Sequence, residues 1–546
     1  RRVLVSAGVY QLGDSMTFDN HVTFEGTVTM PDDKILSLTK NFELPSYIDA
    51  FGNEELAFKK AFQALLENSD HESLDMGGRR INLSEPMDMQ AASATRTTFA
   101  QRRVIRNGQI TATGGAVWDD TVVTSQATYA PNNSKTLSGV VNVANIEVGS
   151  LVTGNGVGRE VYVHAKNVAA QEITLSGPFF DAAGTQNYTF TRFKYMLDFS
   201  KFDYLAKFVL ADVEIRCAGI ASGILLPPTG LIFHLRDCSM TSPKDRCITS
   251  HGEGDQGMQI DGCQFQSNES GSLSQDRTSI VFNTNANDIK VRNNRVVHFR
   301  HFGVIGGSGS IITGNHWFQG DAAMNAIRTA GLVFTALNCR ATVNGNYVDN
   351  SFIEWTNEHD STPVFTGGLS FSGLSFTDNN CLSGNVAPWF GFVVVKPHGA
   401  GHFINGMAVQ GNIFRNVNGN IDRPERVDTS YADLDYAKMR NVNFDANMYN
   451  QVNIPVQNPL VLEHSENSES SIWVVDTEDK LPFNGRALGV DAIVPLGKIS
   501  TAANVAQFDL PYADVQQGAN NDQINLRWSK DVKGKVSMTV RCDRTF

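Results

Sequence analysis

One short phrase recurs between Leu210 and Tyr449, and it restricts the fold of this 546-residue chain more than any other feature. The phrase is an apolar residue, any residue, Asp, Gly or Asn, usually Asn or Cys, any residue, and a second apolar residue. Its copies span residues 210–215, 235–240, 260–265, 291–296, 312–317, 343–348, 376–381, 409–414 and 444–449. The fourth position advances by 25, 25, 31, 21, 31, 33, 33 and 35 residues from one copy to the next. A strand-turn-strand unit repeating at this length indicates a solenoid.

The residue types within the phrase indicate which solenoid forms. Alternating apolar residues are typical of strands with one face in a core. Asp, Gly or Asn at the third position suits a tight corner with a left-handed backbone. Asn at the fourth position can bond its counterpart one coil away, so we expect Asn315, Asn346, Asn379 and Asn412 to line up in a column. The phrase predicts an all-β chain, a right-handed parallel β-helix. A β-propeller would need four strands per repeat, and these repeats have room for about three.

The segments on either side of the repeats predict caps and an insertion. The pattern predicts short strands over residues 1–45. Over residues 46–112 it predicts the beginning of the β-helix, with a capping helix after Asn53. A cap is needed because the first coil would otherwise expose its core and strand edges. Residues 113–200 read as a small inserted β module. Its glycines at 154–158 do not form a phosphate loop, since no Lys-Ser/Thr and helix follow.

The repeats themselves place the main β-helix at residues 201–464, and a C-terminal β domain follows at residues 465–546. Residues 465–471 are polar and linker-like, and the strands after them alternate again. We expect this last domain to be a β-sandwich that serves as an end cap or a trimer clamp.

Charge and cysteine content exclude several partners. The net charge is −12 without a basic block, so nucleic acid is not expected as a ligand. The acidic balance also disfavours a polyanionic substrate unless a local basic groove or a cation intervenes. The seven cysteines include no CxxC pair, which favours buried free thiols over a disulfide framework or zinc site. We predict no metal and no cofactor.

The first residues lack an initiator Met and a long apolar run. We therefore expect no signal peptide and no membrane insertion, and we expect the chain to be a fragment or a processed product whose targeting or anchoring segment lies upstream.

The order of cap, repeated phrase, inserted module and C-terminal β domain resembles the pectate-lyase-like β-helix superfamily, and within it the phage tailspike depolymerases and related surface enzymes. The resemblance implies a homotrimer that holds a polysaccharide along its coil face or between subunits, in an extracellular location or on a virion tail. No catalytic motif of the family matches here, so no catalytic residue is carried over.

The geometry of a β-helix restricts where acid/base chemistry can occur. Carboxylates on adjacent coils would lie roughly 5 Å apart, and those two coils apart roughly 10 Å. The first spacing suits a retaining glycosidase, and the second approaches that of an inverting one.

Two loops carry candidate residues for this chemistry. The stretch 354–360 offers Glu354, Glu358 and Asp360 as acid or base, with Trp355 as a platform for a sugar ring. The stretch 251–257 places Glu253 and Asp255 as further candidate catalytic groups, and His251 as a binding group, among glycines that allow close approach. Further candidates for substrate binding are Lys396, His398 and Arg328. Trp317 and Trp389 are expected to be core or stack residues rather than sugar platforms.

These observations predict a glycoside hydrolase that cleaves a bacterial surface or extracellular polysaccharide. A polysaccharide lyase or epimerase on the same fold remains open, as does a non-catalytic tail protein or adhesin that only binds glycans. A lyase is disfavoured by the negative charge and by the lack of an Asp-rich calcium loop.

Overall fold

The computed structural model describes residues 2–67 and 70–544, so the predicted segments are compared with it outside residues 1, 68–69 and 545–546. The chain folds into two compact units. Unit 1 contains residues 1–321, 329–336 and 358–361, and unit 2 contains residues 322–328, 337–357 and 362–546. The division falls inside the predicted β-helix, so each unit is described by itself.

Unit 1 begins with three two-stranded parallel ladders followed by a helical cap. The ladders pair β1 with β4, β2 with β5 and β3 with β6 (Arg2–Val5, His21–Phe24, Val9–Gln11, Thr27–Thr29, Met16–Phe18 and Leu36–Leu38). Helix α1 spans Leu44–Phe51 and α2 spans Glu54–Glu67. The Asn53 side chain accepts a hydrogen bond from the Leu56 amide, 2.9 Å, as a helix N-cap should. The α2 face with Phe58, Phe62 and Leu65 is buried, which seals the first coil.

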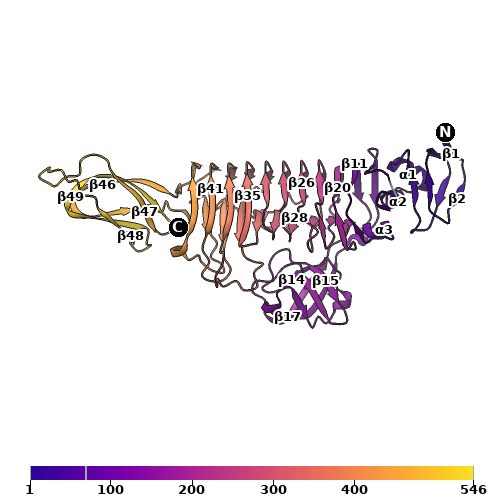
Figure 1. Ribbon diagram of the computed structural model, residues 1–546, viewed down its shortest axis with the longest axis horizontal. Helices are drawn as coiled ribbons and strands as arrows, with labels where there is room; N and C mark the ends of the chain where they lie inside the picture. Colours follow the sequence, from indigo (N-terminus) through magenta and orange to yellow (C-terminus); the bar gives the residue numbers. More distant parts are fainter. Residues whose placement is uncertain (1, 68–69, 545–546) are drawn as a thin grey trace. The chain divides into compact units, whose positions relative to one another are not determined.

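The coils of unit 1 form three long parallel sheets and a short three-stranded one (Figure 1). Two of them meet at the corner made by the repeated phrase. Their strands are β7 (Ser73–Asp75), β8 (Arg80–Leu83), β11 (Arg103–Ala112), β20 (Phe208–Arg216), β23 (His234–Arg236), β24 (Ser239–Thr241), β26 (Gln259–Asp261), β27 (Gln264–Gln266), β29 (Lys290–Arg292), β30 (Arg295–Val297), β32 (Ile311–Thr313) and β33 (His316–Phe318). The third sheet contains β9 (Met87–Asp88), β18 (Tyr195–Asp198), β21 (Ser222–Leu225), β25 (Arg246–Thr249), β28 (Ile280–Thr284), β31 (His301–Ile305) and β34 (Ala330–Phe334). Short elements complete the unit: α3 (Met89–Ser93), β10 (Thr98–Phe99), β19 (Tyr204–Ala206) and β22 (Gly230–Leu231).

The inserted module of unit 1 is a six-stranded antiparallel sheet with its own core. Its strands are β12 (Thr121–Tyr129), β13 (Thr136–Ser138), β14 (Leu151–Thr153), β15 (Val163–Asn167), β16 (Glu172–Leu175) and β17 (Gly184–Arg192). A buried ion pair joins it to the coils: the Arg246 guanidinium donates to Glu160 at 2.7 and 2.9 Å. Both side chains are almost fully buried, so removing either partner would leave an uncompensated charge.

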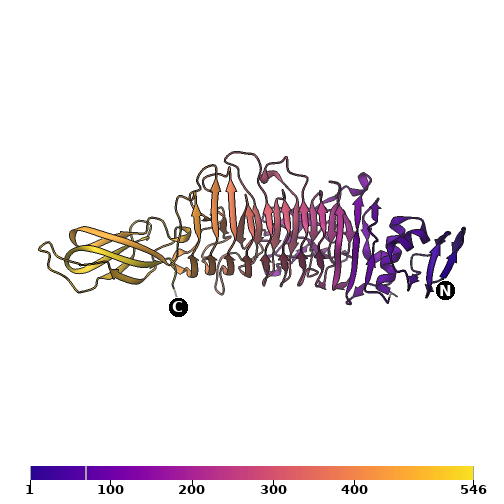
Figure 2. The same cartoon turned by 90° about the horizontal axis from the view of Figure 1, so that it is seen from above.

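Unit 2 continues the same coil pattern, and its strands stack in parallel in Figure 2. The strands are β35 (Asn338–Asn344), β36 (Tyr347–Asp349), β37 (Phe352–Thr356), β38 (Ser372–Thr377), β39 (Asn380–Gly384), β40 (Val393–Lys396), β41 (Asn405–Gln410), β42 (Ile413–Val417), β43 (Glu425–Val427), β44 (Arg440–Asp445) and β45 (Met448–Asn450). The parallel strands of both units confirm the predicted β-helix.

The fourth position of the phrase forms an internal column within each unit. In unit 1 the Asn315 carboxamide oxygen accepts from the Asn294 amide at 3.0 Å, and Asn294 accepts from the Cys263 amide at 2.8 Å. In unit 2 the amide of Asn346 donates to the side chain of Asn379, which repeats the pattern toward Asn412 and Asn447 at 2.9–3.0 Å. The preceding turn residue has a left-handed backbone in all nine copies, including Ala446 at φ 55°.

The C-terminal β domain of unit 2 is one four-stranded antiparallel sheet rather than the predicted sandwich. Its strands are β46 (Leu460–Asp476), β47 (Gly489–Pro495), β48 (Tyr512–Gln517) and β49 (Gln523–Arg541). The strand β49 is 19 residues long and pairs with the other three, so the alternating segments that suggested two sheets lie along one strand. The polar residues 465–471 belong to β46 instead of a linker, because their backbone pairs with β49.

Candidate functional site

Three adjacent strands of unit 2 place a group of aromatic and charged side chains on one sheet face. Strands β37, β40 and β43 pair in parallel, with Glu354 opposite Val394 and Val394 opposite Arg426. Because side chains alternate along a strand, Ile353 and Trp355 point to the core and Glu354 points to the other face, where its side chain is 7% exposed. The face therefore presents residues from three successive coils. We call its members the aromatic–carboxylate cluster: Glu354, Trp389, Lys396, His398, Arg426, Asp428 and Tyr431.

Two exposed rings form flat surfaces in this cluster. Trp389 is 47% exposed and Tyr431 is 54% exposed. The Arg426 guanidinium lies 4.9 Å from the centre of the Trp389 ring, and the Lys396 ammonium lies 5.2 Å from that of Tyr431. The His398 ring stacks on Tyr431 at 4.2 Å and 25°. Cation–π and stacking contacts hold the rings in place, and large amphipathic rings that remain exposed are suited to contact a ligand.

The carboxylate of Asp428 is held in its ionised form. The Lys396 ammonium lies 3.5 Å from one carboxylate oxygen of Asp428. The backbone amide and the hydroxyl of Ser430 donate hydrogen bonds to the other oxygen. Burial would raise the pKa of Asp428, but the Ser430 hydrogen bonds and the Lys396 charge outweigh burial and lower that pKa. Burial lowers the pKa of Arg426, and the negative charges of Asp428 and Glu354 oppose that effect. The cluster thus combines an ionised carboxylate with a second carboxylate and two cations.

The two carboxylates are two coils apart. Glu354 lies on β37, and Asp428 directly follows β43, with β40 between them. Asp428 lies two residues beyond Arg426, the register partner of Glu354 two coils on, so the backbones of the two acidic residues are roughly 12 Å apart. This separation is too long for a retaining glycosidase and is closer to that of an inverting one.

The structure brings three sequence-predicted residues of unit 2 into this cluster, namely Glu354, Lys396 and His398. The structure corrects the expectation that Trp355 is a platform for a sugar ring. Its ring is buried in the core, 5.3 Å from the Phe371 ring, and is not available to a sugar. Arg328 is also buried, and it donates to the Gly384 carbonyl at 3.2 Å, a structural role.

The remaining acidic residues of the stretch 354–360 belong to unit 1. Glu358 is buried and receives the Arg159 guanidinium of the inserted module at 2.7 Å. His359 contacts the same loop, with its ring 2.7 Å from the Arg159 carbonyl. Asp360 is half-buried. Glu358 therefore anchors the module, and the stretch is not one continuous acid/base loop.

The stretch 251–257 is a packed structural loop of unit 1. His251 and Asp255 are fully buried, whereas Glu253 is exposed. Asp255 accepts hydrogen bonds from Ser250 and from the Ala286 amide, and burial raises its pKa to about 6. Side chains at positions 252 and 254 would collide with the carbonyls of Pro228 and Pro227. The glycines therefore accommodate neighbouring backbone, and His251 and Asp255 are not available to a substrate.

Four members of the cluster were missed by the sequence reasoning: Trp389, Arg426, Asp428 and Tyr431. Trp389 was expected in the core together with Trp317, and only Trp317 is buried there. The sequence did contain a signal for these residues. The outward positions of the strand after Phe392 should have outward-facing register partners one coil later in the chain.

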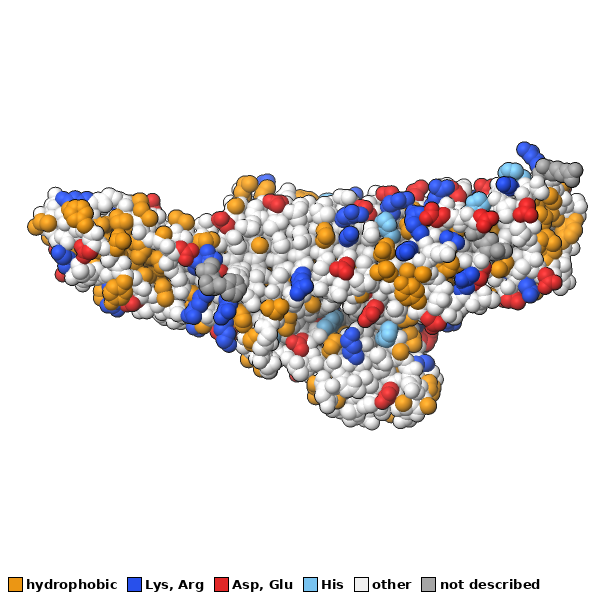
Figure 3. All heavy atoms as spheres, viewed as in Figure 1, with side chains coloured by type: hydrophobic (Ala, Val, Ile, Leu, Met, Phe, Trp, Pro, Cys, Tyr) orange, Lys and Arg blue, Asp and Glu red, His pale blue; other side chains and the backbone are white. Residues whose placement is uncertain are grey.

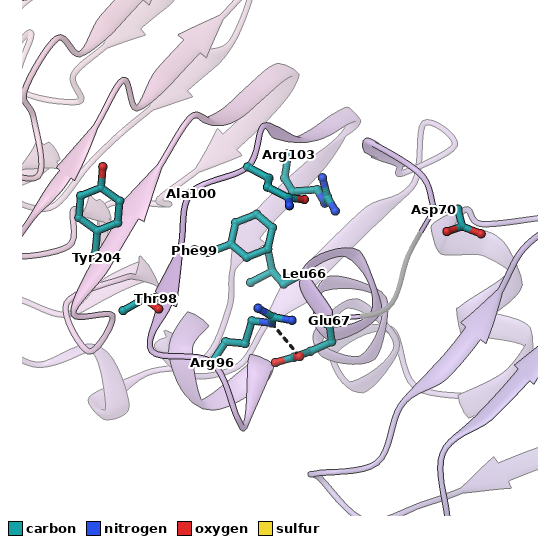
Figure 4. Close-up of a pocket in the computed structure, with 10 residues that line it drawn as sticks. Leu66, Glu67, Asp70, Arg96, Thr98, Phe99, Ala100, Arg103 and Tyr204 are labelled. Carbon is teal, nitrogen blue, oxygen red and sulfur yellow. Dashed lines mark hydrogen bonds and ion pairs between the residues drawn. The ribbon is translucent and has the colours of Figure 1, made fainter.

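Figure 4 shows a pocket of about 630 Å3 beside α2 in unit 1. Phe99 and Tyr204 line it together with charged side chains. Its Glu67 carboxylate is ion-paired with Arg96 at 2.8 Å. One further carboxylate, Asp70, lines this pocket.

Two properties of residues 2–67 and 70–544 bear on metals and membranes. Within these ranges, His, Cys, Asp and Glu side chains form no group of three or more that could hold a metal ion. Nor does any helix there have the length and apolar character needed to cross a membrane. All seven cysteines are buried and free.

Comparisons with known proteins return structures but no sequence family. Neither a family model nor a curated protein matches the chain. A tailspike mutant of E. coli bacteriophage HK620, in complex with a pentasaccharide, aligns at 10% identity over 99% of this chain and 87% of that one, with a TM-score of 0.38. Tailspike gp49 of Pseudomonas phage LKA1 aligns at 9% identity over 90% and 93%, TM-score 0.33. Tailspike gp54 of Acinetobacter baumannii bacteriophage AP22, in complex with capsular saccharide, aligns at 11% identity over 92% and 96%, TM-score 0.28. The structural neighbours are thus phage tailspikes, the proteins that the sequence resembles.

Proposed function

We propose that this chain binds a bacterial surface or extracellular polysaccharide and hydrolyses it at the aromatic–carboxylate cluster of unit 2. One observation carries the proposal: Trp389 and Tyr431 stay exposed while cations and His398 fix their rings, and both lie with Glu354 and Asp428 on one sheet face. Rings of this kind stack against the apolar faces of sugars, and the two carboxylates supply acid and base.

The roles follow from the environment of each group. Asp428 is ionised and acts as the base that takes a proton from the attacking water. Glu354 then gives a proton to the glycosidic oxygen that leaves. Lys396 orients Asp428 through their ion pair, 3.5 Å, and Arg426 holds Trp389 against the sheet. The separation of roughly 12 Å is too long for retention and favours inversion at the anomeric carbon.

The test is to incubate the chain with bacterial surface polysaccharides and to measure reducing ends and the ultraviolet absorbance of an unsaturated uronide. Hydrolysis predicts new reducing ends without that absorbance, and proton NMR of the first product should show the inverted anomer. Both signals together would instead indicate a lyase. Neither signal, with binding retained, would indicate a glycan-binding protein without catalysis.

We also propose that the chain forms a homotrimer and works outside the cell or on a virion tail. The C-terminal domain supports a multimer because it exposes many apolar side chains, and Figure 3 shows orange gathered over this domain. They lie on β46, β47 and β48 and in the loop between β47 and β48: Val461, Val474, Val494, Val505, Phe508, Leu510 and Tyr512. Monomers rarely leave so large an apolar surface in water. Sedimentation should give three times the chain mass at micromolar concentration, and Phe508→Asp with Leu510→Asp should give monomers. A monomeric wild-type chain would contradict this proposal.

A further inference from the structure

The outer face of four consecutive coils in unit 1 gathers cationic side chains. His234, Gln259 and Lys290 are register partners in one row, and Arg236, Asp261 and Arg292 form the next. Around the corner, Gln264, Arg295 and His316 form a third row. We call this surface the basic ladder face: His234, Arg236, Lys290, Arg292, Arg295 and His316. In Figure 3 blue side chains gather over this part of unit 1, where Figure 1 labels β26 and β20.

The cations of this face outnumber its carboxylates. Arg292 pairs with Asp261 at 2.8 Å, and Arg236 lies 3.7 Å from Asp237. Lys290 and Arg295 are exposed, and within the described residues neither forms an ion pair. These two charges are therefore available to a ligand.

Burial and neighbouring positive charge lower the pKa values of the two histidines of this face. Burial lowers the pKa of His234, and Arg236 and Arg292 lower it further against the opposing charge of Asp261. Burial and Arg295 lower the pKa of His316. Positive charge at this face stands out because the whole chain carries a net charge of −12.

We propose that the basic ladder face binds an anionic polysaccharide laid across successive coils, with carboxylate or sulfate groups of the polymer against Lys290, Arg292 and Arg295. The inference rests on the proposed function in taking a polysaccharide as the ligand, and it adds that the polymer is charged. Coils about 4.8 Å apart let one extended chain meet cations from several of them at once. Nucleic acid is the weaker fit, because the face has few cations and no row of exposed aromatic rings for stacked bases.

The experiment compares binding of the whole chain to polygalacturonate, heparin and uncharged dextran at low and high salt by calorimetry. We expect binding to the charged polymers that weakens as salt is added, and little binding to dextran. The double variant Lys290→Gln/Arg295→Gln should lose about tenfold or more in affinity, because two exposed cations no longer face the polymer. These two side chains are exposed and carry no ion pair, so the variant should keep its fold.

The matched control is Lys40→Gln/Lys135→Gln, which removes the same charge from exposed positions elsewhere in unit 1. This control variant should change the affinity for the charged polymers by less than about twofold. Equal losses in both variants, no binding to either charged polymer, or tighter binding of single-stranded DNA would each overturn the inference.

Reducing ends measured in the same samples separate this inference from the proposed function. Salt-dependent binding that the double variant loses, without any cleavage by the wild type, would refute hydrolysis and keep the inference. Cleavage of a polysaccharide at the same rate by the wild type and the double variant, with no binding of either charged polymer, would keep hydrolysis and refute the inference.

Discussion

The coils of each unit contain the same kind of internal column, but the outer faces of the two units differ in their charged residues. Four copies in unit 1, residues 234–241, 259–266, 290–297 and 311–318, carry four Lys or Arg and two Asp. The equivalent copies in unit 2, residues 342–349, 375–382, 408–415 and 443–450, carry one Arg and three Asp. Amide-to-carboxamide bonds of 2.8–3.0 Å run along the column in both units. Inward positions thus determine the coil, while outward positions are free to select a ligand.

The two units also place their candidate chemistry on different sheets. In unit 1 the basic ladder face uses the strands beside the corner of the phrase, whereas in unit 2 the aromatic–carboxylate cluster uses β37, β40 and β43. A repeat protein can vary each outer face independently because each coil contacts only its neighbours.

The largest expected effect tests whether catalysis belongs to unit 2. Asp428→Asn and Glu354→Gln should each lower kcat by about 10^3-fold, because each removes a proton-transfer group. Reducing-end release measures the effect. Asp378→Asn, a change of the same kind on the other face of unit 2, is the control and should keep its rate; the assignment fails if Asp428→Asn is as active as this control.

The inner column allows the next comparison between units. Asn379→Ala should cost about 3 kcal/mol, because it leaves the Asn346 amide buried without its acceptor. Cys263→Ala in unit 1 should cost about 1 kcal/mol, since only a small thiol is lost from the same slot. Urea unfolding of both variants measures the difference. Equal costs would show that the column is not stabilised by its carboxamides.

Buried histidines should give the two units different responses to pH. Among the described residues of unit 1, neither ring nitrogen of His251 has a hydrogen-bond partner, and burial lowers its pKa to about 3. In unit 2 the His402 ring lies 3.1 Å from the Ser370 hydroxyl and 2.6 Å from the Pro363 carbonyl. His251 is neutral in the fold, so its contribution to stability is complete above the unfolded pKa near 6.5 and is lost as pH falls toward 3.

The expected loss from His251 is about 2 kcal/mol at pH 5 relative to pH 7.5. Denaturation at both pH values should show this loss for the wild type and a smaller one for His251→Leu, which has no proton to bind. An unchanged pH dependence in the variant would contradict the role given to His251.

The smallest effect concerns glycan binding at the exposed rings. Trp389→Ala should weaken oligosaccharide binding by about tenfold, because a stacking surface is lost while the fold keeps its core. Calorimetry with a non-cleaved oligosaccharide measures it. Tyr10→Ala, at an exposed ring of unit 1, should bind as the wild type does; equal weakening in both would remove Trp389 from the site.

The parts of this fold that could be predicted from sequence are those that repeat. The phrase fixes the corner and the column because the same local requirement, a left-handed turn followed by a carboxamide, recurs in coil after coil. The N-cap of α2 was predictable for a similar reason, since Asn53 and the acidic first turn act over a few residues.

The candidate site was predictable only in part, because it depends on contacts between distant residues. Glu354 and Lys396 were found as polar residues beside buried strands, yet the strand alternation that turns Glu354 to the outer face also turns Trp355 inward, and Glu354 itself is largely buried. The pairing of Arg159 with Glu358 joins residues far apart in the sequence and follows no local pattern. The glycines around His251 suggested access for a ligand, whereas they make room for a neighbouring coil.

The central claim is that a glycan lies on the outer face of β37, β40 and β43. The crystal structure of the Asp428→Asn variant, soaked with an oligosaccharide of its polymer, tests it most directly. The account predicts sugar rings against Trp389 and Tyr431, with a glycosidic oxygen within reach of Glu354. Sugar bound on another surface, with both rings unoccupied, would contradict it.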